Sequence, residues 1–248
     1  MTTLPDSRHT VTDVLTADLR WDSTPADPAA VVLVLHGGQE HSTAAAGWWQ
    51  LPVLRMLPIA RNLVRVGDGR LAVLRIRYAV RGWNDDLASP LRDTQAALDL
   101  IAARYPGLPL VLAGHSMGGR VALHLMGDER VSAVVGLAPW IERGDAYQPH
   151  DSLQLLIVHG LSDRITSPTA SRALVERLQG QGRRASFIGL SGEKHAMLRR
   201  RRTWDQLTMG FVAAVTGAAD QAPVDESPDD GSAALGARAS SEALLSTL

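Results

Sequence analysis

The feature that constrains the fold most is a serine flanked by glycines, between a short apolar run and a helix-like pattern. Residues 110–113 are apolar, Gly114-His115-Ser116-Met117-Gly118 follow, and apolar residues then recur at helical spacing at Val121, Ala122, Leu125 and Met126. A sharp turn from strand to helix would hold Ser116 in a strained backbone conformation, which only small neighbours such as Gly114 and Gly118 accommodate. The turn would lift the serine oxygen clear of the sheet and aim the Met117 N–H at the group that Ser116 attacks. The stretch therefore predicts a nucleophile elbow with Ser116 at its tip.

Continuous apolar runs alternate with helical patterns over most of the chain. Unbroken apolar runs are typical of strands buried on both faces of a parallel sheet. The runs at 30–35 and 110–113 are unbroken, and those at 71–76, 131–137, 153–158 and 185–190 each contain a single polar residue. Helical patterns lie at 47–66, 89–105, 167–180 and 196–216, and directly after Ser116. The alternation predicts an α/β fold with a mostly parallel sheet covered by helices on both faces. A weaker alternation over 11–21 predicts one or two edge strands.

Prolines and serines mark several helix boundaries. Pro52 and Pro58 should break or kink the helix expected over 47–66. Ser89-Pro90 and Ser167-Pro168 each combine a capping hydroxyl with a proline suited to the first helical position, so each predicts a helix start.

Length and composition favour a single globular domain. The chain has 248 residues, 45% of them hydrophobic, and a formal net charge of −1. We expect one α/β domain over 1–217 and a disordered acidic C-terminal tail over 218–248, where large apolar residues are few. The near-neutral charge gives no reason to expect a nucleic-acid or anionic-membrane partner. The sequence gives no oligomeric state.

The chain lacks several features that would indicate other chemistry or another location. It contains no cysteine, so disulfides, thiolate zinc sites and a cysteine nucleophile are excluded. No apolar run approaches the roughly 18 residues of a membrane span, which argues against an integral membrane contact. The polar residues 1–12 contain no apolar signal-peptide core, so a cytoplasmic location is the expectation.

A reactive serine needs a base, and the base needs an orienting carboxylate. Histidine suits the base because its ordinary pKa of about 6.5 lets it accept and return a proton. His195 lies between the last expected strand and the last expected helix, and Asp163 follows the strand ending at Val158. The order Ser116, Asp163, His195 matches an α/β-type catalytic triad. Asp145, after the preceding strand, is the alternative acid; Glu193 is too close in sequence to His195.

An oxyanion hole needs two backbone N–H donors. Met117 supplies one, and the loop after the strand ending at Leu35 should supply the other. Gly38 is the favoured donor in that loop, with Gln39 as the alternative. His36 is expected to order the loop, and His41, His115 and His159 to be structural, with His41 able to line the pocket. No histidine pair has metal-ligand spacing near a carboxylate, so we expect no metal.

These motifs resemble those of the α/β-hydrolase superfamily, in particular small serine esterases, lysophospholipases and dienelactone-hydrolase-like members. The matching stretches are His36-Gly37-Gly38, Gly114 to Gly119, His159 to Asp163 and Gly192 to His195. The resemblance implies hydrolysis of carboxylic ester or thioester bonds of a small-molecule substrate, through an acyl-serine intermediate and without a cofactor. Dienelactone hydrolases carry a cysteine where this chain has Ser116.

The chain departs from that superfamily in two further ways. The sparse N-terminal strands leave the sheet one strand short of the usual eight, and the short segment between Ala138 and Leu153 leaves no room for a large cap. An open, shallow site for small to medium acyl groups is therefore expected. Aromatic residues near the site could form an apolar pocket or simply pack on the core: Trp48, Trp49, Trp83, Trp140 and Tyr147.

Two other functions remain open. One is a peptidase, which is disfavoured because no cap or substrate-anchoring domain is visible. The other is a catalytically silent hydrolase fold that serves as a binding module, which the complete set of three reactive residues disfavours.

Overall fold

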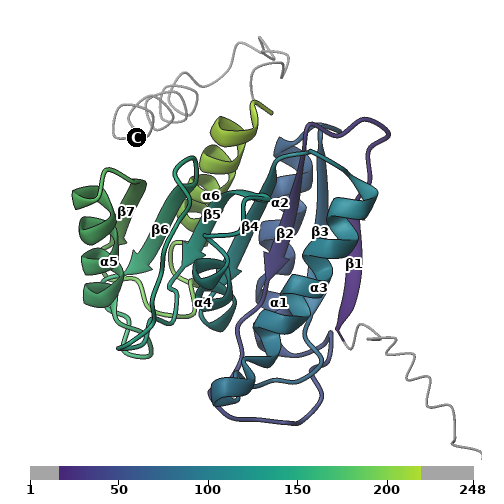
Figure 1. Cartoon of the computed structure of the whole chain (residues 1–248). Coiled ribbons are helices and arrows are strands. Elements are labelled where there is room, and N and C mark those ends of the chain that lie inside the picture. The colour runs from purple at the N-terminus through teal and green to yellow at the C-terminus, as the bar shows by residue number, and fades with distance from the viewer. Residues whose placement is uncertain (1–16, 219–248) are drawn as a thin grey trace, which may run out of the picture.

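The protein is built around one seven-stranded sheet, seen in a computed structural model that describes residues 17–218 (Figure 1). The strand order is β1-β3-β2-β4-β5-β6-β7. The bounds are β1 Asp18–Ser23, β2 Ala30–Leu35, β3 Leu71–Arg77, β4 Leu110–His115, β5 Val131–Leu137, β6 Gln154–Gly160 and β7 Arg184–Leu190. Every neighbouring pair is parallel except β1 with β3, which is antiparallel.

The central strands are buried on both faces, as their unbroken apolar sequences predict. All six residues of β2 and of β4 are buried. β1, in contrast, is mostly half-buried and occupies the sheet edge. The predicted edge strand is thus confirmed for its C-terminal part, whereas residues 11–16 lie outside the described residues. Seven strands among residues 17–218 agree with a sheet one strand short of eight.

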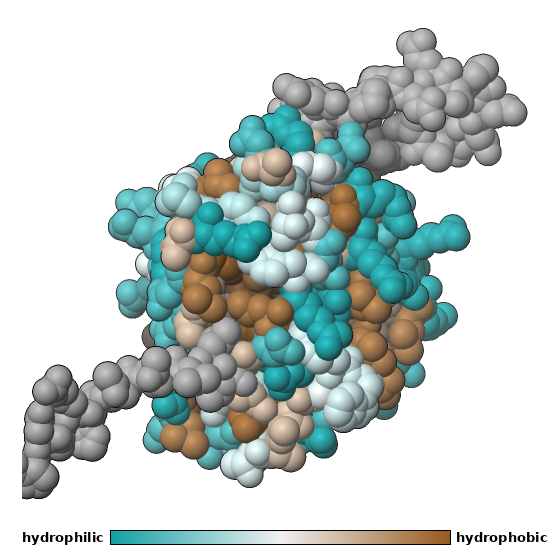
Figure 2. All heavy atoms as spheres, turned by 90° about the vertical axis from the view of Figure 1, so that its right-hand side faces the viewer, coloured by the Kyte–Doolittle hydropathy of each residue, from teal (hydrophilic) through white to brown (hydrophobic). Residues whose placement is uncertain are grey.

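Helices cover both faces of the sheet (Figure 1). Their bounds are α1 Leu51–Arg55, α2 Leu57–Val66, α3 Ser89–Arg104, α4 Met117–His124, α5 Pro168–Gly180 and α6 Arg201–Thr216, with a short 3₁₀ helix, η1, at Asp85–Leu87. One core cluster joins the sheet to α3, α4 and α5. The other joins it to α2 and α6 on the opposite face. The predicted α/β architecture is therefore confirmed. Seen from the β1 side, the surface mixes hydrophilic and hydrophobic patches (Figure 2).

The helical stretch expected over 47–66 is broken, as its two prolines predict, and each proline lies at the start of a helix. Pro52 and Pro58 each lie in the first turn of a helix, and the chain breaks between them at Met56. This position is favourable because the first-turn N–H groups of a helix have no intrahelical partner, so proline loses nothing there. Residues 47–50, which we expected to be helical, precede α1.

Two other helix boundaries differ from the expectation. Ser89 is the first residue of α3, and the capping position belongs to Ala88, which has a φ of 41° and makes no side-chain cap. Ser167 does cap α5, accepting a hydrogen bond from the Ala170 N–H at 3.1 Å. The last helix begins at Arg201 instead of Ala196.

The segment between β5 and β6 contains no helix or strand in the described chain, so no large cap covers the carboxyl ends of the strands. No helix within residues 17–218 is both long and apolar enough to span a bilayer. The expected tail falls outside the described residues apart from Ala218, which is 2% exposed and joins the core cluster of α2 and α6.

Candidate active site

The elbow places Ser116 in the strained conformation that the sequence predicts. Ser116 has φ 55° and ψ −116° between the end of β4 and the start of α4. A Cβ at Gly114 would lie 2.2 Å from the Gly118 carbonyl oxygen, and one at Gly118 would lie 2.5 Å from the Leu35 carbonyl oxygen. Since both obstacles are backbone, neither position can hold a larger residue without moving the sheet.

Ser116, His195 and Asp163 form a continuous hydrogen-bonded chain although they come from three loops. His195 Nε2 is 3.0 Å from Ser116 Oγ, and His195 Nδ1 is 2.8 Å from Asp163 Oδ2. The carboxylate fixes Nδ1 as the protonated nitrogen, so Nε2 has its lone pair directed at the serine hydroxyl. The structure thus brings together the three residues chosen from sequence.

Asp163 is held by several donors besides His195. Its Oδ1 accepts from the backbone N–H groups of Ile165 at 2.8 Å and Thr166 at 3.1 Å, and its Oδ2 accepts from Thr166 Oγ1 at 2.9 Å. His159 Nε2 lies 3.2 Å from the same Oδ2. Burial alone would raise the pKa of Asp163, but the hydrogen bonds from His159, His195 and Ile165 outweigh it and leave the pKa far below its usual value. The carboxylate is therefore ionised at neutral pH.

Sequence reasoning missed the roles of Thr166 and His159 around this carboxylate. Thr166 follows Asp163 by three residues, a spacing at which a carboxylate commonly accepts bonds from the next turn, so a local signal existed. His159 is fully buried at the end of β6 and its Nδ1 lies 2.8 Å from Ser171 Oγ of α5. That contact depends on how α5 packs against the sheet, and no sequence spacing indicates it.

The alternative acid, Asp145, belongs to a different cluster. Its Oδ1 accepts from Arg120 at 2.8 Å and its Oδ2 accepts from the Tyr147 hydroxyl at 2.5 Å. Burial would raise the pKa of Asp145, but hydrogen bonds from His124, Tyr147 and Arg120 lower it well below its usual value. Asp145 therefore balances a buried guanidinium, and the structure does not bring it to His195.

Gly38, the favoured second oxyanion donor, lies against the side chain of Met117. A Cβ on Gly38 would meet the Met117 side chain at 2.3 Å and the Arg81 carbonyl oxygen at 2.4 Å. The competing donor, the Gln39 N–H, is already bonded to the Arg81 carbonyl at 2.8 Å. This contact favours Gly38 over Gln39 as the second donor.

His36 orders the loop, as expected. Its Nδ1 donates to the Gly37 carbonyl at 2.6 Å, and its Nε2 accepts from the Tyr78 N–H at 3.2 Å. Burial lowers the pKa of His36 to about 4, so the ring is neutral and has one defined tautomer.

His115 is a buried structural residue beside the site. Its Nε2 donates to the His195 carbonyl at 3.0 Å, and burial, with a smaller repulsion from His195, lowers its pKa to about 3. His41 is exposed and lies near Glu40 and Asp85. Within residues 17–218 no group of three or more His, Asp or Glu side chains is arranged to hold a metal ion.

The five aromatic residues expected near the site lie in different surroundings. Trp49 is 78% exposed and, with Gly37 and Gly38, lines a cavity of about 380 Å³. Trp83 and Trp140 instead enclose the Arg120 guanidinium, 4.2 Å and 4.4 Å from the two ring centres. Tyr147 is buried against Asp145, whereas Trp48 bonds to Asp18 of β1. Of the five, Trp49 alone lines the cavity beside Gly38.

The sheet order, the elbow and the three-residue chain define the α/β-hydrolase fold, which solved α/β hydrolases share. Residues 66–153 match the family described as serine aminopeptidase, S33. That stretch includes Ser116 but neither Asp163 nor His195.

Among curated proteins, human monoglyceride lipase is 32% identical over 118 residues, which are 47% of this chain and 36% of that protein. The chain thus aligns with about a third of that relative's length. Solved structures share the fold at lower identity. An α/β serine hydrolase without lid from Xanthomonas campestris is 20% identical, with a TM-score of 0.59 over 82% of this chain and 88% of that one. A putative α/β hydrolase from Agrobacterium tumefaciens is 18% identical, with a TM-score of 0.64 over 81% and 92%.

Proposed function

We propose that the protein is a serine hydrolase that cleaves carboxylic ester or thioester bonds of small to medium acyl substrates. The observation that carries the proposal is the chain of hydrogen bonds from Ser116 Oγ to His195 Nε2 at 3.0 Å and from His195 Nδ1 to Asp163 Oδ2 at 2.8 Å. A strained serine in hydrogen-bond contact with an imidazole that a carboxylate orients is arranged for proton transfer, and a purely structural site has no need of this arrangement.

In the first half-reaction, Ser116 Oγ bonds to the substrate carbonyl carbon while its proton passes to His195 Nε2. The carbonyl oxygen becomes an oxyanion, which the N–H groups of Met117 and Gly38 stabilise. The bond to the leaving alcohol or thiol then breaks, and His195 returns the proton to it. Ionised Asp163 stabilises the imidazolium that forms in between.

In the second half-reaction, water replaces the leaving group. His195 takes a proton from the water as its oxygen bonds to the acyl carbon, and the Ser116 ester bond breaks with return of that proton to the serine. The products are a carboxylic acid and free enzyme, so no further reactant is needed.

The open surroundings of the site support esters of modest size. No large cap closes the carboxyl ends of the described strands, and the cavity beside Gly38 holds about 380 Å³. Human monoglyceride lipase and the lidless Xanthomonas serine hydrolase are similar proteins, and their names describe a lipase and a serine hydrolase, which is consistent with the proposal.

The family description, serine aminopeptidase, makes amide hydrolysis the second candidate. Turnover of a p-nitrophenyl ester series from acetate to palmitate, beside the p-nitroanilides of amino acids, separates the two. We expect ester cleavage that peaks at short to medium chains and disappears in Ser116→Ala. Faster cleavage of anilides than of esters would assign the peptidase function, and no cleavage of either by folded protein would favour a silent binding module.

A further inference from the structure

Four large apolar side chains protrude into solvent along one edge of the candidate site. Trp49 is 78% exposed, Leu51 75%, Leu54 43% and Leu198 71%. We call these four residues the apolar rim. Isolated exposed apolar residues are common on protein surfaces, but a contiguous group marks a contact surface for a partner.

The rim is contiguous because two neighbouring cavities share it. Trp49 and Leu51 line the cavity of about 380 Å³ that also contains Gly37 and Gly38. Leu51, Leu54 and Leu198 line a second cavity of about 340 Å³, which reaches Ala196, the residue after His195. The rim therefore runs from the oxyanion loop to the histidine loop, beside the candidate nucleophile.

The charged residues around the rim are almost all positive. Within 42–67 and 194–204, the segments that carry the rim, the ionic side chains other than histidine are all cationic: Arg55, Arg61, Arg65, Lys194, Arg199, Arg200, Arg201 and Arg202. The carboxylates that flank the second segment, Glu193 and Asp205, are 1% and 8% exposed, whereas Asp68, which follows the first segment at the end of α2, is exposed. The two segments are joined by the Asn62 to Asp205 hydrogen bond of 2.8 Å between α2 and α6.

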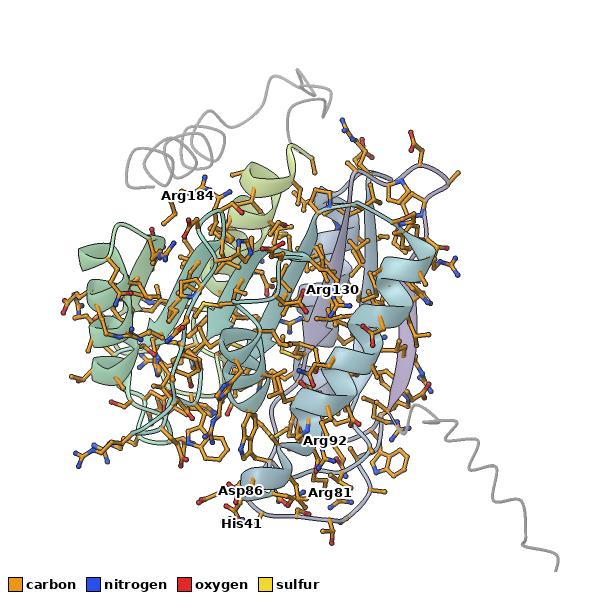
Figure 3. The ribbon with its side chains drawn as sticks, in the orientation of Figure 1. His41, Arg81, Asp86, Arg92, Arg130 and Arg184 are labelled. Atoms are coloured by element: carbon orange, nitrogen blue, oxygen red, sulfur yellow. The ribbon has the colours of Figure 1, made fainter. Side chains whose placement is uncertain are left out.

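The overall composition does not reveal this local excess of cationic side chains. The whole chain has a net charge of −1, from which we expected no anionic-membrane partner. The fold, however, brings α1, α2 and the start of α6 together, so Arg55 and Arg201 line the second cavity with the rim leucines. The carboxylate among its lining residues, Asp205, is 8% exposed. Figure 3 shows Asp86 and His41 at the edge where the parallel strands end and Arg184 at the opposite edge.

We propose that this face binds the surface of an anionic lipid bilayer. Exposed leucines and a tryptophan enter the interfacial region of a bilayer, where the tryptophan ring is favoured. Long arginine side chains around them reach the negatively charged headgroups. Bound in this way, the protein lies on the membrane without spanning it, and the candidate site opens toward the lipid. The binding itself requires no turnover, so it stands apart from the proposed reaction.

The test is co-sedimentation of the full chain with phosphatidylcholine vesicles, with or without phosphatidylserine, at low and high salt. Using Ser116→Ala beside the wild type keeps the result independent of catalysis. We expect both proteins to bind the phosphatidylserine vesicles, to bind pure phosphatidylcholine at least about tenfold more weakly, and to be released by salt.

Matched variants separate this face from the rest of the surface. Trp49→Ser with Leu198→Ser should weaken binding at least about tenfold, whereas Leu100→Ser, an exposed leucine on α3, should not. Arg200→Gln with Arg202→Gln should weaken it similarly, whereas Arg183→Gln with Arg184→Gln removes equal charge elsewhere and should not.

Three outcomes would overturn the proposal. The first is that the protein does not bind vesicles, and the second is that the control variants lose as much vesicle binding as the rim variants do. The third is that the protein self-associates with increasing concentration, that the rim variants abolish this self-association, and that vesicles remain unbound. The last outcome would make the face an interface between copies of this chain.

Discussion

At the scale of single residues, the proposed reaction depends on which carboxylate orients His195. Asp163 touches His195 Nδ1 at 2.8 Å, whereas Asp145 is bound to Arg120 and Tyr147. We expect Asp163→Asn to lower kcat for an ester by about 10³-fold or more, because an amide stabilises the wrong imidazole tautomer. Asp145→Asn should leave kcat within a few-fold and instead lower stability by about 3 kcal/mol, because the buried Arg120 loses the nearer of its two carboxylate partners and retains Glu142 at 3.2 Å. Steady-state kinetics and denaturant unfolding of both variants measure this, and the reverse ranking of kcat would contradict the assignment.

Thr166 is expected to act through Asp163 without touching substrate. Its hydroxyl donates to Asp163 Oδ2 at 2.9 Å and also lies 3.2 Å from His195 Nδ1. Thr166→Val keeps the volume but removes the donor, so we expect kcat to fall about tenfold with KM unchanged. Thr166→Ser retains the hydroxyl and should restore most of the rate. If the serine variant were as slow as the valine variant, packing rather than the hydrogen bond would be the reason.

At the scale of elements, the elbow depends on how closely β2 and α4 approach each other. A Cβ on Gly118 would lie 2.5 Å from the Leu35 carbonyl and 2.7 Å from the His36 carbonyl. Gly118→Ala should therefore destabilise the protein by about 2–3 kcal/mol or more and displace the candidate oxyanion loop. Gly210→Ala is the matched control, because that helical glycine of α6 has open space around it and alanine should stabilise by about 1 kcal/mol. Thermal unfolding of the two variants checks this; an unchanged Tm for Gly118→Ala would contradict the close approach.

The strands and the elbow were predictable because each depends on a pattern of residues that are adjacent in sequence. β2 and β5 have the bounds read from the sequence, since an apolar run buried on both faces ends where polar residues begin. The start of α6 was not predictable. Buried Glu193 accepts hydrogen bonds from the N–H groups of Arg199 and Arg200, and Met197 has a φ of 57°, so residues 196–200 form a loop around that carboxylate. The sequence marks Glu193 as a polar loop residue and gives no sign that it is buried.

In the candidate site, too, some features could be predicted from sequence and others could not. Ser116, Asp163 and His195 follow their strands in a recognisable order, so sequence alone could select them. The contact of His159 with Asp163, and the separation of Asp145 from His195, arise from packing between elements that are distant in sequence, and sequence alone could not supply them.

At the scale of the whole molecule, buried neutral histidines make stability depend on pH. Burial lowers the pKa of His36 to about 4 and that of His115 to about 3 in the folded protein, against about 6.5 unfolded. Between these values the unfolded chain binds more protons, so the free energy of unfolding falls as pH decreases below about 6.5. Each of these two histidines should lower the free energy of unfolding by about 2 kcal/mol at pH 5.

Asp163 affects stability at lower pH than the histidines do. Its pKa is lower in the folded protein than the unfolded value of about 4, so its ionised carboxylate stabilises the fold above about pH 4. This stabilisation is lost only as the pH falls below that value. Denaturant unfolding at pH 7 and pH 5 therefore isolates the histidines. His115→Gln should reduce the difference in unfolding free energy between the two pH values by about 2 kcal/mol. An unchanged difference would mean that His115 is not buried in the neutral form.

The proposed domain extends to Ala218, so we expect it to fold and function without residues 219–248. Ala218, one residue beyond the expected domain end at 217, is buried against the core of α2 and α6. A chain truncated after Ala218 should keep its Tm and its ester turnover. Loss of turnover with an unchanged Tm would mean that residues 219–248 contribute to the site.

The most direct test of the central claim is mapping of the site that a fluorophosphonate modifies. Only a serine activated by a neighbouring base reacts readily with such a reagent. We predict one covalent adduct per chain, on Ser116 in the peptide that contains residues 114–119, and no adduct in Ser116→Ala. An adduct elsewhere, or none on folded wild-type protein, would contradict the assignment of Ser116 as the nucleophile of a serine hydrolase.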